Sequence, residues 1–400
     1  PKTATFTAVS GEGYFCNTSG GAFTVNLPAG SAGAIVSLAD YAATWQTNNM
    51  TITPNGTEKI GGVAASFVAQ TEGQSITLVY VDATQGWINT MDSTSNVRGE
   101  TFIVATGGTV LTNGDFKTHV FTGSGTFCVS AGSGSLAVAD YFVVAGGGGS
   151  GSNDGGGGAG GFRLSNSVGC VPAPTMSPLS ACVSALPVTV TGYPIVVGAG
   201  GSPAGPGCGG TANTPGGVST FSTITSTGGG RSKNPANPEG GPGGSGGGTY
   251  NGTTGAGNTP PVSPPQGNDG GVAGPGPSFI WTSGGGAGAP GSNASPQIGG
   301  AGSFIADTFI GPTAPSYGTP GPVGSTRYLA GGGGGANQGP TSGSTHAGGV
   351  GGGGTGASVD ATNNTAGGTN TGGGAGSGNG GSGAGQSGGS GIVIIRYKFQ

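Results

Sequence analysis

The sequence predicts an all-β protein that continues into a lattice of extended glycine helices, with little or no α-helix. Three observations lead to this fold class. Glycine accounts for 99 of the 400 residues, against about 7% in ordinary proteins. Short apolar and alternating runs, bounded by Gly-Gly and Asn-Gly turns, fill the first third of the chain. No segment shows a 3.6-residue hydrophobic period with helix caps.

The composition changes near residue 140. Residues 1–140 contain 19 glycines and 3 prolines, whereas residues 141–400 contain 80 glycines and 24 prolines. We therefore expect three parts: a β-sandwich-like module at 1–98, a short β module at 99–140, and a glycine-rich domain at 141–400 that a C-terminal strand closes.

Several short β-type runs are the expected strands. They are residues 3–9, 22–27, 34–39, 50–53, 75–81, 87–90, 102–105, 116–121, 126–130, 141–145, 188–197 and 392–399. Residues 141–145 and 392–397 are apolar runs at the two ends of one domain, and the ends of a domain often lie close together. We expect these two strands to pair.

The glycine tracts admit three structures. They include residues 155–161, 240–248, 284–291, 331–335, 348–356 and 367–391. A collagen helix needs glycine at every third position, which these runs do not keep. A flexible coil is the usual state of glycine-rich chain, but apolar strands frame these tracts at both ends. We favour packed left-handed helices of three residues per turn, joined by N–H···O bonds between neighbours. Replacing Gly157 or Gly333 by Val should then push neighbouring helices apart.

Charge and hydropathy exclude two classes of partner. Only 6% of the residues are charged and the net charge is −4, so no basic patch is available for nucleic acid. No run approaches the roughly 20 apolar residues of a membrane helix. The chain begins Pro-Lys without Met, so we expect it to be a piece of a longer or processed polypeptide.

The sequence offers no constellation for catalysis, metal or cofactor. His119 lies in an expected strand, and we interpret it as a structural residue. His346 lies in a glycine-rich loop, and we expect it to be exposed to solvent. The five cysteines are far apart without a CxxC pair, which argues against zinc. Buried free thiols are expected, with Cys170 and Cys182 the only pair close enough for a local disulfide. We expect no enzyme, no cofactor and no metal.

Four motifs resemble the glycine-rich domains of bacteriophage tail-fibre and receptor-binding proteins. They read YFVVAGGGG at 141–149, GGGGAGGFR at 155–163, PIVVGAGG at 194–201 and GSGIVIIRY at 389–397. Residues 10–92 resemble a β module of cyanophage fibre proteins, through GEGYF at 11–15, NTSGG at 17–21, LADY at 38–41 and VYVDATQGW at 79–87.

The resemblance implies a virion tail fibre, outside the host cell and usually a homotrimer. It implies binding to a host surface polysaccharide or outer-membrane protein through loops between glycine helices, and attachment to other tail proteins through a region upstream of residue 1. The alternative is a purely structural subunit of a fibre shaft or of a secreted surface fibril.

Receptor binding is expected in the loops at 276–283 and 303–330. Exposed aromatic rings stack on sugars, and arginine can hydrogen-bond an anionic glycan. The candidate residues are Phe279, Trp281, Phe304, Phe309, Tyr317, Arg327 and Tyr328. Against this, the same rings could simply cover the flanks of the glycine lattice.

Overall fold

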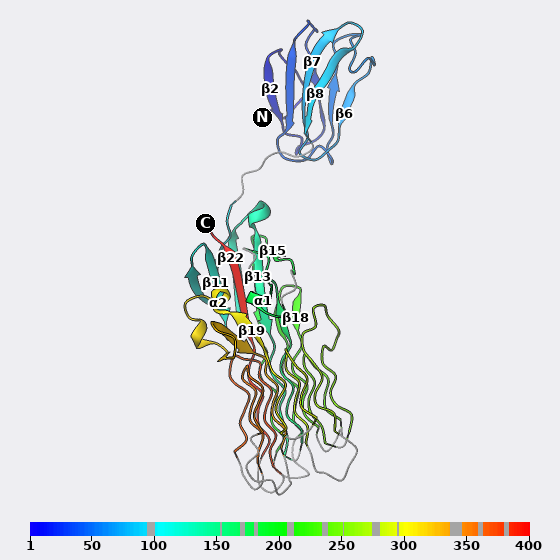
Figure 1. The fold of residues 1–400 in the computed structure, drawn as a ribbon. Coiled ribbons are helices and arrows are strands. Elements are labelled where there is room, and N and C mark those ends of the chain that lie inside the picture. The colour runs from blue at the N-terminus through cyan, green and yellow to red at the C-terminus, as the bar shows by residue number, and fades with distance from the viewer. Residues whose placement is uncertain are drawn as a thin grey trace. The chain divides into compact units, whose positions relative to one another are not determined.

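The computed structural model divides the chain into two compact units, Pro1–Gly99 and Glu100–Gln400 (Figure 1). It describes residues 1–93, 101–152, 154–168, 173–179, 183–205, 212–233, 239–250, 252–273, 281–293, 296–336, 346–358, 363–379 and 384–400. Within these ranges no helix has the length and apolar character needed to cross a bilayer.

The N-terminal unit is a sandwich of two four-stranded sheets, ordered β2-β4-β7-β8 and β1-β3-β5-β6. Its strands are β1 (Phe6–Thr7), β2 (Glu12–Cys16), β3 (Phe23–Asn26), β4 (Ile35–Asp40), β5 (Met50–Thr53), β6 (Phe67–Ala69), β7 (Ser75–Asp82) and β8 (Gly86–Ser93). In β4, β5 and β7 alternate residues are buried, as expected for sheets with one face on a core.

One shared core holds the two sheets together. Trp45, Met50, Ile52 and Trp87 have no exposed surface. The N-terminal unit is thus a two-sheet sandwich. Strands β2 and β6 lie where no strand was predicted, and the first strand is confined to Phe6–Thr7.

The C-terminal unit begins as a second sandwich, which we call its base. One sheet has the order β10-β11-β22-β13-β14, with β15 also paired to β13, and the other has the order β18-β17-β16-β12-β9. The strands are β9 (Val104–Thr106), β10 (Thr109–Asn113), β11 (Phe116–Phe121), β12 (Gly125–Ala131), β13 (Val138–Val144), β14 (Phe162–Leu164), β15 (Leu186–Pro187), β16 (Gly192–Val196), β17 (Ser219–Phe221), β18 (Ile224–Ser226) and β22 (Ile392–Lys398).

The predicted pairing of the two terminal strands is confirmed. Strand β22 pairs antiparallel with β13, Ile392 opposite Val144 and Ile395 opposite Tyr141, and also with β11. The predicted boundary at residue 140 is wrong, because β13 crosses it and residues 100–140 belong to the same unit as the glycine tracts. The composition changes there because the chain leaves a sheet, not because it leaves a domain.

Both faces of the β13–β22 pair are covered. The second sheet packs on one face; on the other lie the strands β19 (Ser303–Ala306), β20 (Thr319–Pro320) and β21 (Thr326–Leu329), with helix α2 (Asp307–Ile310). The short helix α1 (Ala173–Met176) and the 3-10 turns Gly134–Leu136 and Ala314–Ser316 complete the described helices. Burial on both faces explains why Ile392–Ile395 is continuously apolar instead of alternating.

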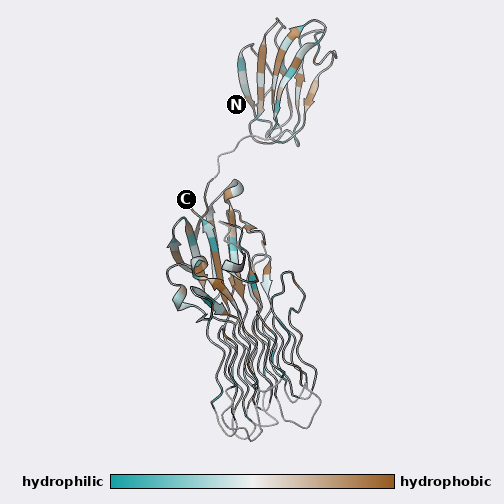
Figure 2. Cartoon of the chain, viewed as in Figure 1, coloured by the Kyte–Doolittle hydropathy of each residue, from teal (hydrophilic) through white to brown (hydrophobic). Residues whose placement is uncertain are grey.

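The glycine tracts run from the base to the opposite end of the unit, and their pale colour contrasts with the apolar strands (Figures 1 and 2). Their backbones bond to one another with a three-residue period. Gly157 N–H donates to the carbonyl of Ala375, and Gly160, three residues later, donates to Gly372. The same three-residue spacing recurs with two other tracts. The N–H groups of residues 156 and 159 donate to the carbonyls of 282 and 285, and those of 158 and 161 donate to the carbonyls of 230 and 227. Tract 155–161 also accepts bonds from Ala145, Gly148, Ser245, Gly248 and Gly333.

These bonds surround one tract with six neighbours, three reached through its N–H groups and three through its carbonyls. A helix of three residues per turn directs successive backbone groups to three different sides, and the observed bonds have the same three-residue spacing. The backbones touch: a Cβ added to Gly157 would lie 2.2 Å from the Gly148 carbonyl oxygen, and one added to Gly333 would lie 1.9 Å from that of Ala375.

Candidate functional site

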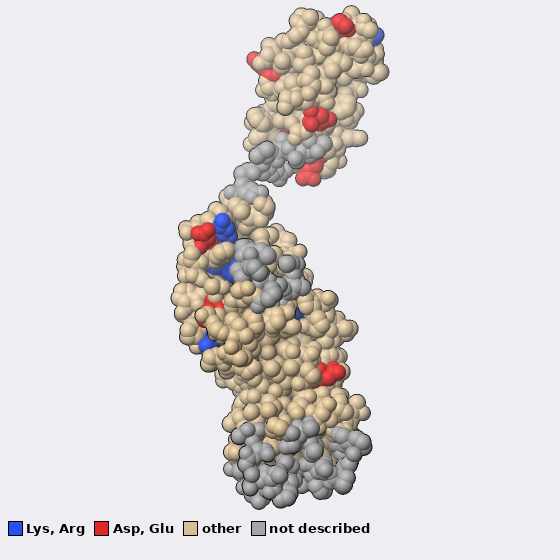
Figure 3. All heavy atoms as spheres, viewed as in Figure 1, with Lys and Arg blue, Asp and Glu red and all other residues tan. Residues whose placement is uncertain are grey.

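The tracts bring many distant parts of the chain together at the end opposite the base, which we call the tip end (Figure 1). Bonds near this end join Ser150 to Gln386, Lys233 to Gly248, and Ala357 to Ser377. Few charged side chains lie over the tracts on the face drawn in Figure 3.

A cation and two aromatic rings form a row across three tracts at the tip end. The Lys233 ammonium lies 5.0 Å from the Tyr250 ring centre, and that ring lies 5.8 Å from the ring of Trp281. Lys233 and Tyr250 are half-buried, whereas Trp281 is 2% exposed. Cation–π and aromatic contacts of this kind are stabilising. The row runs from the partly exposed Lys233 to the buried Trp281.

Within the described part of the chain, three side chains at the tip end have buried polar atoms without a hydrogen-bond partner. They are the Trp281 indole N–H, both amide atoms of Gln297, and Nδ1 of His346. All three residues flank the tract at 332–336, where a Cβ added to Gly335 would meet both Trp281 and Gln297. An unmet buried polar group costs about 1–3 kcal/mol, so these groups are suited to ordered water or to polar groups of a bound partner.

The protonation of His346 is set by its surroundings. Burial lowers the pKa of its imidazole, and the residue is 2% exposed. The expectation of an exposed His346 is therefore wrong, because tracts pack around its position. His119 is structural as expected: its Nδ1 lies 2.7 Å from the Gly107 carbonyl and its Nε2 lies 3.1 Å from the Tyr397 hydroxyl.

Asp154 is a carboxylic acid inside the lattice. It is 5% exposed, and burial raises its pKa to about 7, although the nearby charges of Lys233 and Arg231 act to lower it. It lies at the start of the tract that leads to β14. An acid of this pKa changes its charge near neutral pH.

The residues expected to bind a receptor do not form one exposed surface. Phe304, Phe309 and Tyr328 are buried at the base, around β19, α2 and β21, and Trp281 is buried at the tip end. For these four rings the predicted exposed loop is wrong, because tract and sheet packing covers them.

The other candidates have structural roles or lie elsewhere. Tyr317 packs partly buried against the core. The Arg327 guanidinium donates to the carbonyls of Tyr317 at 2.7 Å and Gly318 at 3.1 Å, so it braces its own loop. Phe279 lies outside the described residues, as do Cys170 and Cys182. Cys16 is a buried free thiol as expected, whereas Cys128 is free but exposed.

Sequence reasoning missed Asp154, Lys233 and Gln297. The sequence did carry one signal for these residues, which is that each lies within a few residues of the end of a glycine tract. That signal is weak without the structure, because the sequence does not say which tract ends meet.

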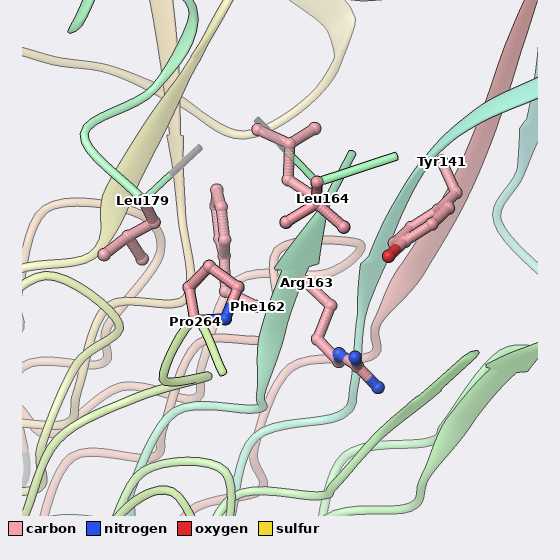
Figure 4. A pocket seen from close by; sticks show the side chains of 7 residues that line it. Tyr141, Phe162, Arg163, Leu164, Leu179 and Pro264 are labelled. Atoms are coloured by element: carbon pink, nitrogen blue, oxygen red, sulfur yellow. The ribbon is translucent and has the colours of Figure 1, made fainter. Parts of the chain in front are cut away.

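The described residues include a small cavity in the base. Its volume is about 10 Å³, room for about one water molecule. Figure 4 shows Phe162, Leu164 and Leu179 around it, with the Arg163 guanidinium extending away. It is too small for a ligand. No cluster of three or more His, Cys, Asp or Glu side chains fit to hold a metal ion occurs in the described ranges.

A family model for a glycine-rich domain matches residues 121–398. The chain belongs to this glycine-rich domain family. The match begins at the end of β11 and ends with β22, so the glycine-rich domain comprises most of the base as well as all the tracts. No curated protein matches the chain.

Proposed function

We propose that this chain is a bacteriophage tail-fibre protein whose glycine-rich domain binds the host cell surface at its tip end. The receptor is a surface polysaccharide or an outer-membrane protein. The chain acts as a homotrimer on the virion and outside the host, without catalysis, and other tail proteins carry it. The resemblance of the motifs at 141–149 and 389–397 supports the tail-fibre context.

One observation carries the proposal: tracts from between residues 146 and 391 end together at the tip end of a backbone-bonded bundle. Binding residues are commonly borne by connections that a rigid scaffold positions. A rigid scaffold also lowers the entropy lost on binding. Lys233 and Tyr250 are partly exposed there, and they offer a cation and a ring to a receptor.

A purely structural role is the second candidate. It is favoured by the burial of Phe304, Phe309 and Tyr328 in the base, where these rings stabilise the domain instead of meeting a partner. A fibre-shaft or surface-fibril subunit needs only that stability.

A blocking experiment separates the two functions. An azide-bearing amino acid is placed either at Asn363, exposed at the tip end, or at Val323, exposed in the base, and is coupled to a bulky polyethylene glycol. Binding of each labelled chain to a panel of bacteria is measured by flow cytometry. We expect the tip-end label to abolish binding and the base label to leave it unchanged.

Two outcomes contradict the proposal. If the unlabelled chain binds no strain of a broad panel, the structural role is favoured. If only the base label blocks binding, the receptor surface lies away from the tip end.

A further inference from the structure

Both ring nitrogens of His119 make hydrogen bonds inside the base. The residue has no exposed surface. Its Nδ1 lies 2.7 Å from the Gly107 carbonyl oxygen, and its Nε2 lies 3.1 Å from the Tyr397 hydroxyl oxygen. A carbonyl oxygen can only accept, so Nδ1 carries a proton. In the neutral ring Nε2 is then bare and accepts the proton of the Tyr397 hydroxyl.

Tyr397 extends this contact to the second sheet of the base. Burial raises the pKa of Tyr397 to about 12, and a hydrogen bond with the backbone of Ala105 acts to lower it. A bond that lowers the pKa of a phenol is donated to its oxygen, so the donor is the Ala105 amide. The amide of β9 thus donates to Tyr397 in β22, Tyr397 donates to His119 in β11, and His119 donates to Gly107 after β9.

The turn between β9 and β10 is packed closely against its neighbours. A Cβ added to Gly107 would lie 2.0 Å from the carbonyl oxygen of Thr126, and one added to Gly108 would lie 2.7 Å from that of Val120. Strand β9 is the edge strand of its sheet, where it pairs with β12. The chain of hydrogen bonds through His119 therefore ties an edge strand and its turn to the central sheet.

The charged groups near His119 oppose a positive charge on its ring. Burial lowers the pKa of the imidazole; the bond to the Gly107 carbonyl acts to raise it, and the Lys117 ammonium adds to the lowering. Strands β9, β10 and β12 carry no charged residue. On β22, the neighbours of Tyr397 in sequence are Arg396 and Lys398, which are cations as well.

The acidic residues of the central sheet are bound to other groups. Asp115, in the turn between β10 and β11, lies 3.8 Å from the Lys398 ammonium. The Asp140 carboxylate of β13 accepts hydrogen bonds from residues 165–168. Neither carboxylate acts on the pKa of His119. The rings of Phe127 and Tyr397, centred 5.0 and 5.5 Å from the imidazole, cover it instead.

Protonation of Nε2 would turn a hydrogen-bond acceptor into a donor that faces another donor. The Tyr397 hydroxyl would have to turn its proton away from the ring, and that proton would lose its acceptor. We propose that His119 and Tyr397 form an acid-sensitive clasp, which holds β9 and the turn at residues 107–108 on the central sheet while His119 is neutral and releases them when it is protonated. This device does not depend on the proposed function.

The direction of the pH effect follows from where the proton binds more tightly. A released, solvated His119 has a pKa near 6.5, whereas burial keeps the pKa of the clasped ring lower. The clasped state binds fewer protons, so its stability is complete above about pH 7.5 and decreases as the pH falls through about 6.5 toward the lowered pKa. The opening equilibrium should increase by up to about tenfold per pH unit in that window.

Hydrogen exchange of the full chain tests the clasp. The amides of residues 104–106 report its closed state, because β9 is the strand that the clasp retains. After correction for intrinsic exchange, their protection should fall about three- to tenfold between about pH 7.5 and pH 5.5. The amides of β13, which stays paired with β22, should change less. His119→Gln, whose side chain cannot take up a proton, should remove the pH dependence.

His346→Gln is the matched control. His346 is the second of the two histidines in the chain, and it too is buried with a pKa that burial lowers. Because it lies at the tip end, its replacement should leave the pH dependence of residues 104–106 unchanged. The clasp is rejected if His119→Gln retains the parent's pH dependence, or if the parent shows none.

Titration of the His119 ring nitrogens by NMR needs no variant. We expect a bare Nε2 near pH 7.5 and a midpoint below about 6.5. A midpoint at or above that value, or a proton on Nε2 at neutral pH, would also reject the clasp.

Discussion

Each lattice-facing glycine lets two backbones touch, and this contact is the unit from which the tracts are built. Gly157 N–H donates to Ala375, and Gly333 N–H donates to Gly157. Bonds of this kind are made only if no side chain separates the backbones. Glycine is the costliest residue to order, so the lattice depends on satisfying nearly every N–H and carbonyl group.

Gly333→Ala should strongly destabilise the C-terminal unit. The added methyl group would lie 1.9 Å from the Ala375 carbonyl oxygen, and backbone cannot move aside as a flexible side chain can. We expect a loss of about 2–3 kcal/mol, at the upper part of the range for overpacking. The control is Gly123→Ala, since a Cβ at Gly123 meets nothing within 4 Å. Equal melting temperatures for the two variants would refute the close backbone contact.

A buried and hydrogen-bonded carboxyl group, that of Asp140, organises part of the base. The Asp140 carboxylate accepts bonds from Ser165 Oγ and from the amides of Ser167 and Val168, each at 2.9 Å. The Arg396 guanidinium donates to the Val168 carbonyl at 2.7 Å. Burial raises the pKa of Asp140, and these hydrogen bonds oppose the rise. Together they fix the segment after β14 onto β13 and β22.

Asp140→Ala should cost about 3–5 kcal/mol, because it leaves a buried cation uncompensated and three donors unmet. Chemical denaturation would measure the loss. Asp115→Ala removes the exposed partner of Lys398, at 3.8 Å with both side chains about half exposed, and should cost about 0–1 kcal/mol. A small effect of Asp140→Ala would mean that packing alone positions residues 165–168.

Among the elements, strand β22 holds the two ends of the glycine-rich domain together. It lies between β11 and β13 in the central sheet, and Ile392–Ile395 has no exposed surface. Its odd and even residues serve different cores: Ile392 and Ile394 face α2 and β19, whereas Val393 and Ile395 face the second sheet. A single strand therefore couples both layers of the base.

Deletion of residues 391–400 should yield insoluble or protease-sensitive protein, because it removes the shared strand of the central sheet and uncovers β11 and β13 as edges. Limited proteolysis followed by mass spectrometry would show this. Removal of residues 399–400 alone, which leaves β22 in place, should be tolerated far better. A soluble, protease-resistant 1–390 chain would contradict the coupling.

At the scale of the whole molecule, the two units have separate cores. The N-terminal core contains residues from 8 to 87 only, and the two cores of the other unit start at Ile103 and Val120. Their stabilising forces also differ. The N-terminal unit buries apolar side chains, whereas the tracts add a backbone hydrogen-bond lattice to the apolar base.

Calorimetry should therefore show two transitions. Ile52→Ala, at a residue with no exposed surface in the N-terminal unit, should cost about 2–5 kcal/mol and lower only one of them. Ile394→Ala should lower only the other. A single transition that both variants shift would show that the units unfold cooperatively.

The sequence by itself determined the β-rich class, the pairing of residues 141–145 with 392–397, and the three-residue period of the tracts. The class and the period depend on local signals, because alternation and glycine density act within a few residues of chain. The pairing follows from the position of two apolar runs at the two ends of one domain. Only the tertiary structure decided the extent of the base. It also decided the burial of Trp281 and Tyr328 and the position of Asp154. Which tract lies beside which depends on backbone bonds between residues far apart in the chain, such as Gly147 and Gly389, which are 242 positions apart. Glycine carries no side chain to encode that choice, so the sequence pattern could not reveal which side chains the lattice encloses.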